Sequence, residues 1–417
     1  MNIRITSATL IDNQHNLNGQ EVCIRIKDGK IDAIEPQLDA QDGETVIHHK
    51  NLKVSSGWFD SSVNLGEPGH EERETLANGL QVAARSGFTS IAAQPTTVPV
   101  IDNNSSVRYL RDRAAQHAVD LFPIGALTQG ASGIDLAELY DMHQGGAVAF
   151  GDYQQGVDNP NLLKLALQYV QGFGGLVLAF PQSKQLVGKG IVNEGIPATN
   201  LGLKGIPALA ESLQIARDLH VLEYTGGKLH IPTISTKAAV ALIGEAKTKG
   251  LDVTCSVAIA HLVFTDEALS EFDTRYKLMP PLRAEEDRQA LIAGLKDGTI
   301  DMVCSDHDPI DIENKKLEFD HAMYGTIAQE VTYKALLSLV SEEKAVRLLT
   351  AARERFTGEK STITAGKPAN LTFFSTEGTS VYTKDHIFSK SKNSAFLGQQ
   401  LPGTVHGIIA NNQWINA

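Results

Sequence analysis

Short apolar runs separated by longer segments of helical period fill the middle of the chain, from residue 56 to residue 364. Clear examples of these runs are residues 89–93, 147–150, 176–180 and 300–304. Apolar strands that alternate with helices are typical of a parallel sheet covered on both faces. About 310 residues of such units fit a TIM-like (β/α)₈ barrel with insertions. A doubly wound open sheet is the alternative, but no glycine-rich fingerprint supports it. Residues 162–170 are largely apolar and are expected to be helix core.

The two ends of the chain differ from the middle, because apolar and polar residues alternate there in short runs. Examples of these alternating runs are residues 2–5, 22–26, 369–374 and 407–410. Alternation with a period of two is typical of strands, and Asp28-Gly29 supplies a hairpin turn. We predict that residues 1–55 and 365–417 pair into one small β-domain, a sandwich formed by both termini, and that residues 56–364 form the barrel.

Composition argues against several classes of partner. The 417 residues carry 37 Lys and Arg against 49 Asp and Glu, and the resulting net charge of −12 disfavours nucleic acid and anionic membranes. No basic start followed by an apolar run opens the chain, and no stretch approaches the roughly 18 apolar residues of a membrane helix. The three cysteines, Cys23, Cys255 and Cys304, form no CxxC pair, as in a reduced compartment. We expect a cytoplasmic protein.

The stretch from Gly57 to Gly69 is predicted to be a buried strand that runs into a loop. Side chains two residues apart on a strand point to the same side, so Asp60, Ser62 and Asn64 line one side of its end. Barrels place their chemistry at the carboxyl ends of their strands. We therefore predict a functional site on this side of the strand.

Further landmarks follow this strand in the order and at the spacing of one known family. They are residues 83–90, 94–100, 145–150, 234–237, 276–283, 297–301, 304–309 and 389–396. With these landmarks, nearly the whole chain resembles the dihydroorotase and cyclic-amidohydrolase family. The resemblance implies an amidohydrolase-type barrel. It implies less about activity, because one fold hosts many functions.

In that family an Asp-x-His-x-His run on the first strand supplies two metal ligands, and further histidines and carboxylates complete the site, which holds zinc in active relatives. The metal makes a hydroxide that attacks a cyclic amide. The resemblance assigns the metal ligands to positions that hold Ser62, Asn64, Tyr153, Phe180, Thr233 and Asp306 here, called the six ligand positions below. Only Asp306 keeps the type of a ligand. Asp152, next to Tyr153, is expected to face the other side if the strand continues to it. We expect no bound metal.

The positions that hold substrate in the family are changed as well. The resemblance places an arginine at Gly66, an asparagine near Thr96 and a second asparagine at Met279. Gly66 and Met279 have no side chain that could hold a carboxylate or a ring amide. The metal site and the substrate contacts are therefore expected to be lost together.

Few residues remain that could rebuild a catalytic site. The 13 histidines include no HxH, HxxH or HxxxH pair. His261 and His307 lie in segments expected near the barrel mouth, where a single histidine is more often structural than a ligand. Asp306 is the candidate catalytic base, although an aspartate at a strand end also holds loop backbone, the role we favour for it and for Asp60. Ser62 with either histidine would make a nucleophile and base, but there is no nucleophile elbow.

Three hypotheses remain. The first is a pseudo-dihydroorotase, a barrel without its metal. The resemblance implies that such non-catalytic homologues serve as structural partners of aspartate transcarbamoylase in pyrimidine biosynthesis. The second is an active dihydroorotase, or a hydrolase of a related cyclic amide, with an atypical site that draws on Asp306 and His307. The third is a small-molecule sensor that uses the emptied pocket. We favour the first and expect a homo-oligomer.

Overall fold

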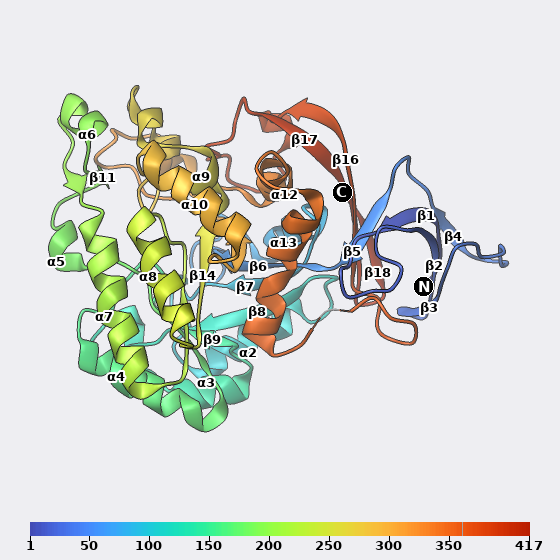
Figure 1. Ribbon diagram of the computed structural model, residues 1–417, viewed down its shortest axis with the longest axis horizontal. Coiled ribbons are helices and arrows are strands. Elements are labelled where there is room, and N and C mark those ends of the chain that lie inside the picture. Colours follow the sequence, from blue (N-terminus) through green and yellow to red (C-terminus); the bar gives the residue numbers. More distant parts are fainter. Residues whose placement is uncertain (361) are drawn as a thin grey trace.

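The computed structural model describes residues 1–360 and 362–417, and within these residues a parallel sheet of eight strands forms a nearly closed barrel. Helices cover the outside of the barrel (Figure 1). In order around the sheet, the strands are β6 (Trp58–Val63), β7 (Phe88–Ala93), β8 (Asp120–Gly125), β9 (Ala149–Phe150), β10 (Leu176–Leu178), β13 (Lys228–Ile231), β14 (Val253–Ala258) and β15 (Met302–Cys304). The fold class predicted from the alternating pattern is confirmed.

The barrel closes between its first and last strands. Val63 of β6 forms an isolated parallel bridge with His307, just beyond β15. The amide of Asn64 donates a 2.8 Å hydrogen bond to the carbonyl oxygen of His307. The amide of Ser305 donates a 3.0 Å hydrogen bond to Oδ1 of Asp60. The polar residues that end these two strands therefore form the seam of the barrel.

Helices follow the barrel strands along the chain. The longer ones are α1 (Leu76–Arg85), α2 (Asn104–Ala114), α3 (Leu139–Gly145), α4 (Pro160–Val170), α7 (Leu209–Thr225), α8 (Lys237–Thr248), α10 (Glu285–Asp297), α12 (Gln329–Leu337) and α13 (Glu342–Thr357). Shorter elements are α5 (Lys184–Val187), β11 (Val192–Asn193), α6 (Ile196–Leu201), β12 (Gly205–Ile206), α9 (Ile259–Val263) and α11 (Ile312–Lys315). In the part of the chain that the structure describes, none of the helices has the length and apolar character needed to cross a membrane.

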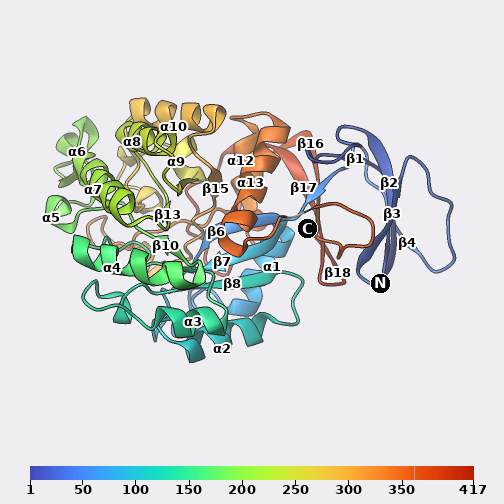
Figure 2. The ribbon, with the colours of Figure 1, turned by 60° about the horizontal axis from the view of Figure 1, so that its bottom comes forward.

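A second sheet is built from both ends of the chain and lies at one side of the barrel, away from α4 and α7 (Figures 1 and 2). Its strands are β1 (Asn2–Leu10), β2 (Glu21–Lys27), β3 (Lys30–Glu35), β4 (Thr45–Ile47), β5 (Lys53–Ser56), β16 (Leu371–Val381), β17 (Gln400–Ala410) and β18 (Gln413–Asn416). β5 pairs antiparallel with β16, so the N-terminal and C-terminal parts share one sheet. The domain limits at residues 55 and 365 stay a prediction.

The barrel joins this sheet through a cluster of aromatic rings. Trp58 opens β6 directly after β5, and its ring centroid lies 5.4 Å from that of Phe374 on β16. Tyr333 of α12 lies 4.8 Å from Trp58 and 5.2 Å from Phe374. Buried aromatic contacts of this kind contribute packing energy beyond the area they bury. They fix the start of β6, and therefore the strand that carries the predicted site.

The expectation that residues 162–170 are helix core is only partly correct. Helix α4 begins after Asn159, whose side chain accepts a hydrogen bond from the amide of Asn161. The helix buries Leu162, Leu163, Ala166, Leu167 and Val170. Its other apolar residues, Leu165 and Tyr169, are exposed to solvent. The period of the helix turns them away from the barrel.

Candidate functional site

The first and last of the six ligand positions meet at the seam of the barrel. Ser62 lies on β6, and Asp306 lies two residues beyond β15. The hydroxyl of Ser62 donates a 2.7 Å hydrogen bond to Oδ1 of Asp306. Gln94, directly after β7, donates from Nε2 to Oγ of Ser62 over 3.1 Å. The proton and one lone pair of this hydroxyl are therefore engaged by protein groups.

Tyr153 completes the contacts of Asp306. Its hydroxyl donates to Oδ1 of Asp306 over 3.3 Å and accepts from Nε2 of Gln154 over 3.0 Å. Burial raises the pKa of Tyr153 well above its usual value, and the charge of Asp306 raises it further. The phenol is therefore neutral and acts as a donor. Burial also raises the pKa of Asp306 to about 6, against the opposing effect of the hydrogen bonds from Ser62 and Tyr153.

Phe180 and Thr233 close the remaining space. With Ser62 and Tyr153 they border a cavity of about 10 Å³. A space of this size holds one water molecule at most. Phe180 is buried and belongs to one apolar cluster with Met279, so a ligand position and a substrate position pack in the same cluster.

The backbone at three of the six ligand positions has a left-handed conformation. The φ angles are 51° at Tyr153, 47° at Thr233 and 47° at Asp306. Such angles are uncommon for residues other than glycine, and a β-branched threonine is an outlier there. Strained backbone of this kind clusters at functional sites. The backbone at these positions therefore has the strain that is typical of functional sites.

The six ligand positions do not fit a zinc-like ion. Structural and catalytic zinc sites use three or four nitrogen, sulfur or carboxylate ligands. Here the positions offer one carboxylate, one amide, three hydroxyls and a phenyl ring. Among the residues that the structure describes, no group of three or more His, Cys, Asp and Glu side chains could hold a metal ion. The expectation that this barrel lacks the family's metal site is consistent with its donor set.

The three substrate positions hold no side chain that could bind a carboxylate as an arginine does, although Gly66 and Thr96 line an open cleft. A Cβ atom at Gly66 would lie 2.0 Å from the carbonyl oxygen of His70, so no side chain fits without a shift of the backbone. Thr96 donates from its hydroxyl to Oδ1 of Asn64 over 2.6 Å. Met279 is buried, and its sulfur accepts from Nε2 of Gln182 over 3.1 Å. The contacts of Thr96 and Met279 are therefore internal.

An open cleft of about 620 Å³ adjoins the closed ligand positions. Asn64 and Tyr153 form part of its wall, as does Asp308. Burial raises the pKa of Asp308 to about 7, and the nearby charge of Asp306 raises it further. Asp308 follows Asp306 by two residues, so the alternation of a strand end could have predicted it on the same side. The cleft has the size of small-molecule sites.

Two buried lysines, Lys277 and Lys315, hold a loop beside this cleft, and Lys277 itself lines the cleft. Nζ of Lys277 donates to the carbonyl oxygens of Phe319 and Asp320 over 2.7 and 2.9 Å. Nζ of Lys315 donates to the carbonyl oxygen of Met323 over 2.9 Å, and burial lowers its pKa to about 7. Sequence reasoning assigned a role to neither residue, although Lys277 lies in the landmark 276–283, and Lys315 lies outside all the landmarks. Their bonds to backbone carbonyls indicate that they hold the loop of residues 319–323 in place.

The other candidate residues have structural contacts. Nε2 of His261 bonds to the carbonyl oxygen of Pro280 over 2.9 Å. Nδ1 of His307 accepts from the amide of Ala328 over 3.3 Å. Neither histidine is hydrogen-bonded to Ser62, so the nucleophile and base considered from sequence are not brought together. Asp60 is buried and accepts from Ser305, which is a role in holding backbone.

Asp152 and Tyr153 face different directions, although strand alternation is not the reason, because β9 ends at Phe150 and Tyr153 has a left-handed backbone. Asp152 is buried and accepts hydrogen bonds from the amide and hydroxyl of Thr128, over 3.0 and 2.6 Å. Burial raises the pKa of Asp152. Tyr153 instead contacts Asp306. The carboxylate nearest to the ligand position is therefore committed to the loop after β8.

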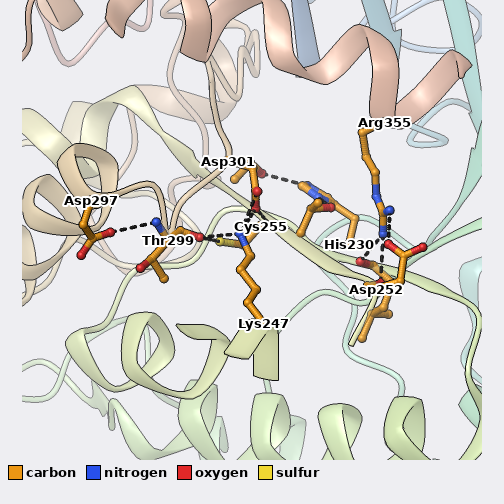
Figure 3. A network of polar contacts seen from close by, with 11 residues as sticks. His230, Lys247, Asp252, Cys255, Asp297, Thr299, Asp301 and Arg355 are labelled. Carbon is orange, nitrogen blue, oxygen red and sulfur yellow. Dashed lines mark hydrogen bonds and ion pairs between the residues drawn. The ribbon is translucent and has the colours of Figure 1, made fainter. Parts of the chain in front are cut away.

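A second polar network lies at the opposite, amino-terminal end of the barrel strands (Figure 3). Nζ of Lys247 donates to both carboxylate oxygens of Asp301 over 2.7 Å, and Asp301 accepts from the amide of Cys255 over 2.8 Å. The ring nitrogens of His230 bond to the hydroxyls of Thr254 and Ser256, over 2.9 and 3.1 Å. Polar groups at this end of a barrel usually serve stability.

Comparisons with known proteins agree with the barrel fold and identify the family. A dihydro-orotase-like family model matches residues 53–239, and an amidohydrolase family model matches residues 198–415. The fold is similar to an L-hydantoinase (dihydropyrimidinase) from Arthrobacter aurescens, with a TM-score of 0.87, 21% identity, and coverage of 99% of this chain and 96% of that one. A dihydropyrimidinase from Brevibacillus agri has a TM-score of 0.81 at 21% identity, over 100% of this chain and 96% of that one. These structures support the fold alone.

Curated relatives match over the full length. A protein named dihydroorotase from Geotalea daltonii is 37% identical over 100% of this chain and 99% of its own length. Another, from Geobacter metallireducens, is 36% identical over 97% of this chain and 96% of its own length. The chain therefore belongs to the dihydroorotase family, within the amidohydrolase superfamily.

Proposed function

We propose that this chain is a non-catalytic member of the dihydroorotase family that acts as a structural partner of aspartate transcarbamoylase. One observation carries the first half of the proposal. The only carboxylate among the six ligand positions, that of Asp306, accepts hydrogen bonds from Ser62 and Tyr153. Full-length similarity to relatives named dihydroorotase supports a place in pyrimidine biosynthesis.

The chemistry of amide hydrolysis explains why this observation matters. A metal ion makes the attack possible near neutral pH because it lowers the pKa of its bound water to about 7. A lone aspartate would have to act as a general base on a positioned water. The cavity at Ser62 and Phe180, about 10 Å³, is too small to hold a cyclic substrate beside that water. Neither route to an attacking hydroxide is therefore supported.

The proposed structural role beside aspartate transcarbamoylase rests on the family resemblance. Non-catalytic homologues in this family accompany aspartate transcarbamoylase, and a barrel that keeps its fold without its metal fits that role. The closed barrel also supports the structural role. The hydrogen bond between Ser62 and Asp306 replaces a metal as the link between the first and last strands. A rigid barrel is what a structural subunit requires.

The second candidate function is a working hydrolase of dihydroorotate or a related cyclic amide with an atypical site. The open cleft of about 620 Å³ favours it, since Asp308, with a pKa raised to about 7, lies on the cleft wall. A carboxyl group with such a pKa is suited to acid or base catalysis at neutral pH. In this case the reaction would take place in the cleft rather than at the six ligand positions.

Two assays on purified protein separate these functions. The first measures dihydroorotate turnover and zinc content after growth with added zinc, with the Geotalea daltonii relative treated identically as the control. We expect turnover and zinc in the control, and neither in this chain. Turnover that Asp308→Asn abolishes would establish the second candidate instead.

The second assay mixes the chain with the aspartate transcarbamoylase of the same organism and measures the mass of the product by light scattering. The proposal predicts one complex that contains both proteins. Separate elution of the two proteins at high concentration would overturn the scaffold role while leaving the absence of turnover unaffected.

A further inference from the structure

Three segments beside the cleft, residues 191–206, 264–276 and 311–324, pack around a small apolar cluster. The buried members of this cluster are Val192, Ala198, Leu269 and Phe319. Helix α6 contacts the 3₁₀ turn Asp266–Leu269, and the hydroxyl of Thr274 donates to the carbonyl oxygen of Lys315 over 2.8 Å. Both α6 and β11 lie at the end of the molecule away from the terminal sheet (Figures 1 and 2). We call the outer surface of these three segments the mouth rim.

Apolar side chains of the mouth rim remain exposed around this cluster. Ile196 on α6 is 77% exposed, Phe272 is 46% exposed and Leu317 is 42% exposed. The ring of Phe272 lies 6.3 Å from that of Phe319, so it packs at the edge of the cluster and still faces solvent. Ile312 on α11 is exposed as well. Single exposed apolar residues are normal, but several on segments that pack together mark an interaction surface.

The mouth rim also carries an excess of negative charge. Its exposed carboxylates, none of which takes part in an ion pair within the described part of the chain, are Glu194, Glu267, Glu271, Glu313, Glu318 and Asp320. The exposed side chains that can oppose them are those of Lys204, Lys316 and His321. Glu271 directly precedes Phe272, and Glu318 directly follows Leu317. Carboxylates therefore lie next to the exposed apolar side chains.

We propose that the mouth rim is the docking surface for a segment of another protein that presents basic side chains around apolar ones. Opposite charges steer such a segment to the rim and fix its orientation. Ile196, Phe272 and Leu317 supply the apolar area that docking buries. A second copy of this chain does not match the rim, because it carries a net charge of −12. Nucleic acid and anionic membranes are repelled for the same reason.

Docking at the mouth rim affects the cleft as well. Ile191 and Asp320 belong to the rim segments and also line the cleft of about 620 Å³. A docked segment therefore lies at the edge of the cleft and narrows its opening. The proposal does not depend on the absence of catalysis, or on aspartate transcarbamoylase being the partner.

Binding of a labelled peptide to the full-length protein tests this proposal. The probe is a fluorescein-labelled helical peptide of leucine and lysine, about 14 residues and about 20 Å long. Fluorescence anisotropy measures its dissociation constant. We expect binding that weakens as the salt concentration rises from about 0.05 to about 0.3 M. The same peptide with glutamate in place of lysine should not bind.

Variants that remove charge show where the peptide binds. Glu271→Gln combined with Glu318→Gln should raise the dissociation constant at least about fivefold, because two opposing charges are lost from the contact. Glu138→Gln combined with Glu343→Gln is the matched control, since it removes two exposed carboxylates from α13 and the start of α3. The control should change the dissociation constant less than about twofold.

Variants that remove apolar area test the second part of the contact. Ile196→Ser, at a side chain 77% exposed, should raise the dissociation constant at least about fivefold, because less apolar surface is buried. Tyr224→Ser, on α7 and 78% exposed, is the matched control and should leave binding unchanged. Circular dichroism confirms that each variant is folded, and Leu317→Ser takes the place of Ile196→Ser if the latter does not fold.

Three results would overturn the proposal. They are the absence of measurable binding, equal weakening by the rim variants and their controls, and crosslinks that fall outside the rim. For the last of these, a benzophenone group on the apolar side of the peptide is activated by light, and the crosslinked residues are identified by mass spectrometry. We expect crosslinks within residues 191–206, 264–276 and 311–324.

Discussion

The hydroxyl of Ser62 and the carboxylate of Asp306 are joined by a 2.7 Å hydrogen bond that links the first and last strands of the barrel. The family resemblance assigns a metal ligand to each of these positions. In this chain the two residues bind each other, and the same pair that would hold a metal closes the barrel. A barrel closed in this way fits the proposed role of a structural partner.

Removing this bond is expected to destabilise the protein. Ser62→Ala deletes a buried donor and leaves Asp306 with the weaker bond from Tyr153. Hydrogen bonds to charged groups contribute about 1.5–3 kcal/mol, and Asp306 is partly exposed, so we expect the lower end of that range. Urea unfolding of the variant beside wild type measures the change. An unchanged free energy of unfolding would show that the seam does not depend on this bond.

Restoring the two histidines of the first strand should not restore a metal site. Ser62→His with Asn64→His places two rings beside a cavity of about 10 Å³, and overpacking of this kind costs about 1–3 kcal/mol. Phe180 and Thr233 still offer no ligand that zinc prefers. We expect a lower melting temperature and no bound zinc by elemental analysis. Stoichiometric zinc with a higher melting temperature would contradict the conclusion that the donor set is unsuitable.

Gly66 is expected to be intolerant of any side chain. Gly66→Ala brings a Cβ atom to 2.0 Å from the carbonyl oxygen of His70 and 2.8 Å from that of Glu74. Both contacts are with backbone, so relief requires movement of the loop and a loss of more than about 2 kcal/mol of stability. Gly172→Ala is the control, since a Cβ atom there has no neighbour within 4 Å. Equal melting temperatures for the two variants would refute this prediction.

His230 should make stability depend on pH. Burial lowers its pKa from 6.5 to about 3, so the folded protein holds the ring neutral while the unfolded chain protonates it. The contribution of His230 to the free energy of unfolding is therefore fully present above pH 6.5. It is lost as pH falls toward 3, by up to about 1.4 kcal/mol per pH unit. Burial raises the pKa values of Asp60 and Asp218 to about 6, which acts in the opposite direction.

The comparison is therefore made between wild type and His230→Gln at each pH. Urea unfolding between pH 7 and pH 4 should show the advantage of the wild type shrinking as pH falls. A constant difference across this range would mean that His230 does not titrate on unfolding. The network in Figure 3 would then stabilise the barrel only through its hydrogen bonds.

The alternation of short apolar runs with helical segments was enough to predict the barrel, because parallel strands covered on both faces need continuous apolar sequence. Period-two alternation likewise predicted the strands at the two ends of the chain. These features depend on neighbouring residues along the chain. They are therefore visible in the sequence.

Features that depend on contacts between distant segments were not visible. The bond between Ser62 and Asp306 spans 244 residues, and the close approach at Gly66 depends on a loop that folds back on itself. The exposure of Leu165 and Tyr169 was missed because the prediction treated residues 162–170 as uniformly apolar, although Lys164 and Gln168 beside them mark the solvent side of α4. Lys277 and Lys315 come together only in the folded protein, where Nζ of Lys315 donates to the carbonyl oxygen of Lys277.

The decisive measurement is dihydroorotate turnover by the purified chain, followed together with its zinc content after zinc has been supplied during growth. We predict no turnover and substoichiometric zinc, while the Geotalea daltonii relative binds zinc and turns over substrate under the same conditions. Stoichiometric zinc with turnover that a chelator abolishes would contradict the proposal that this barrel is non-catalytic.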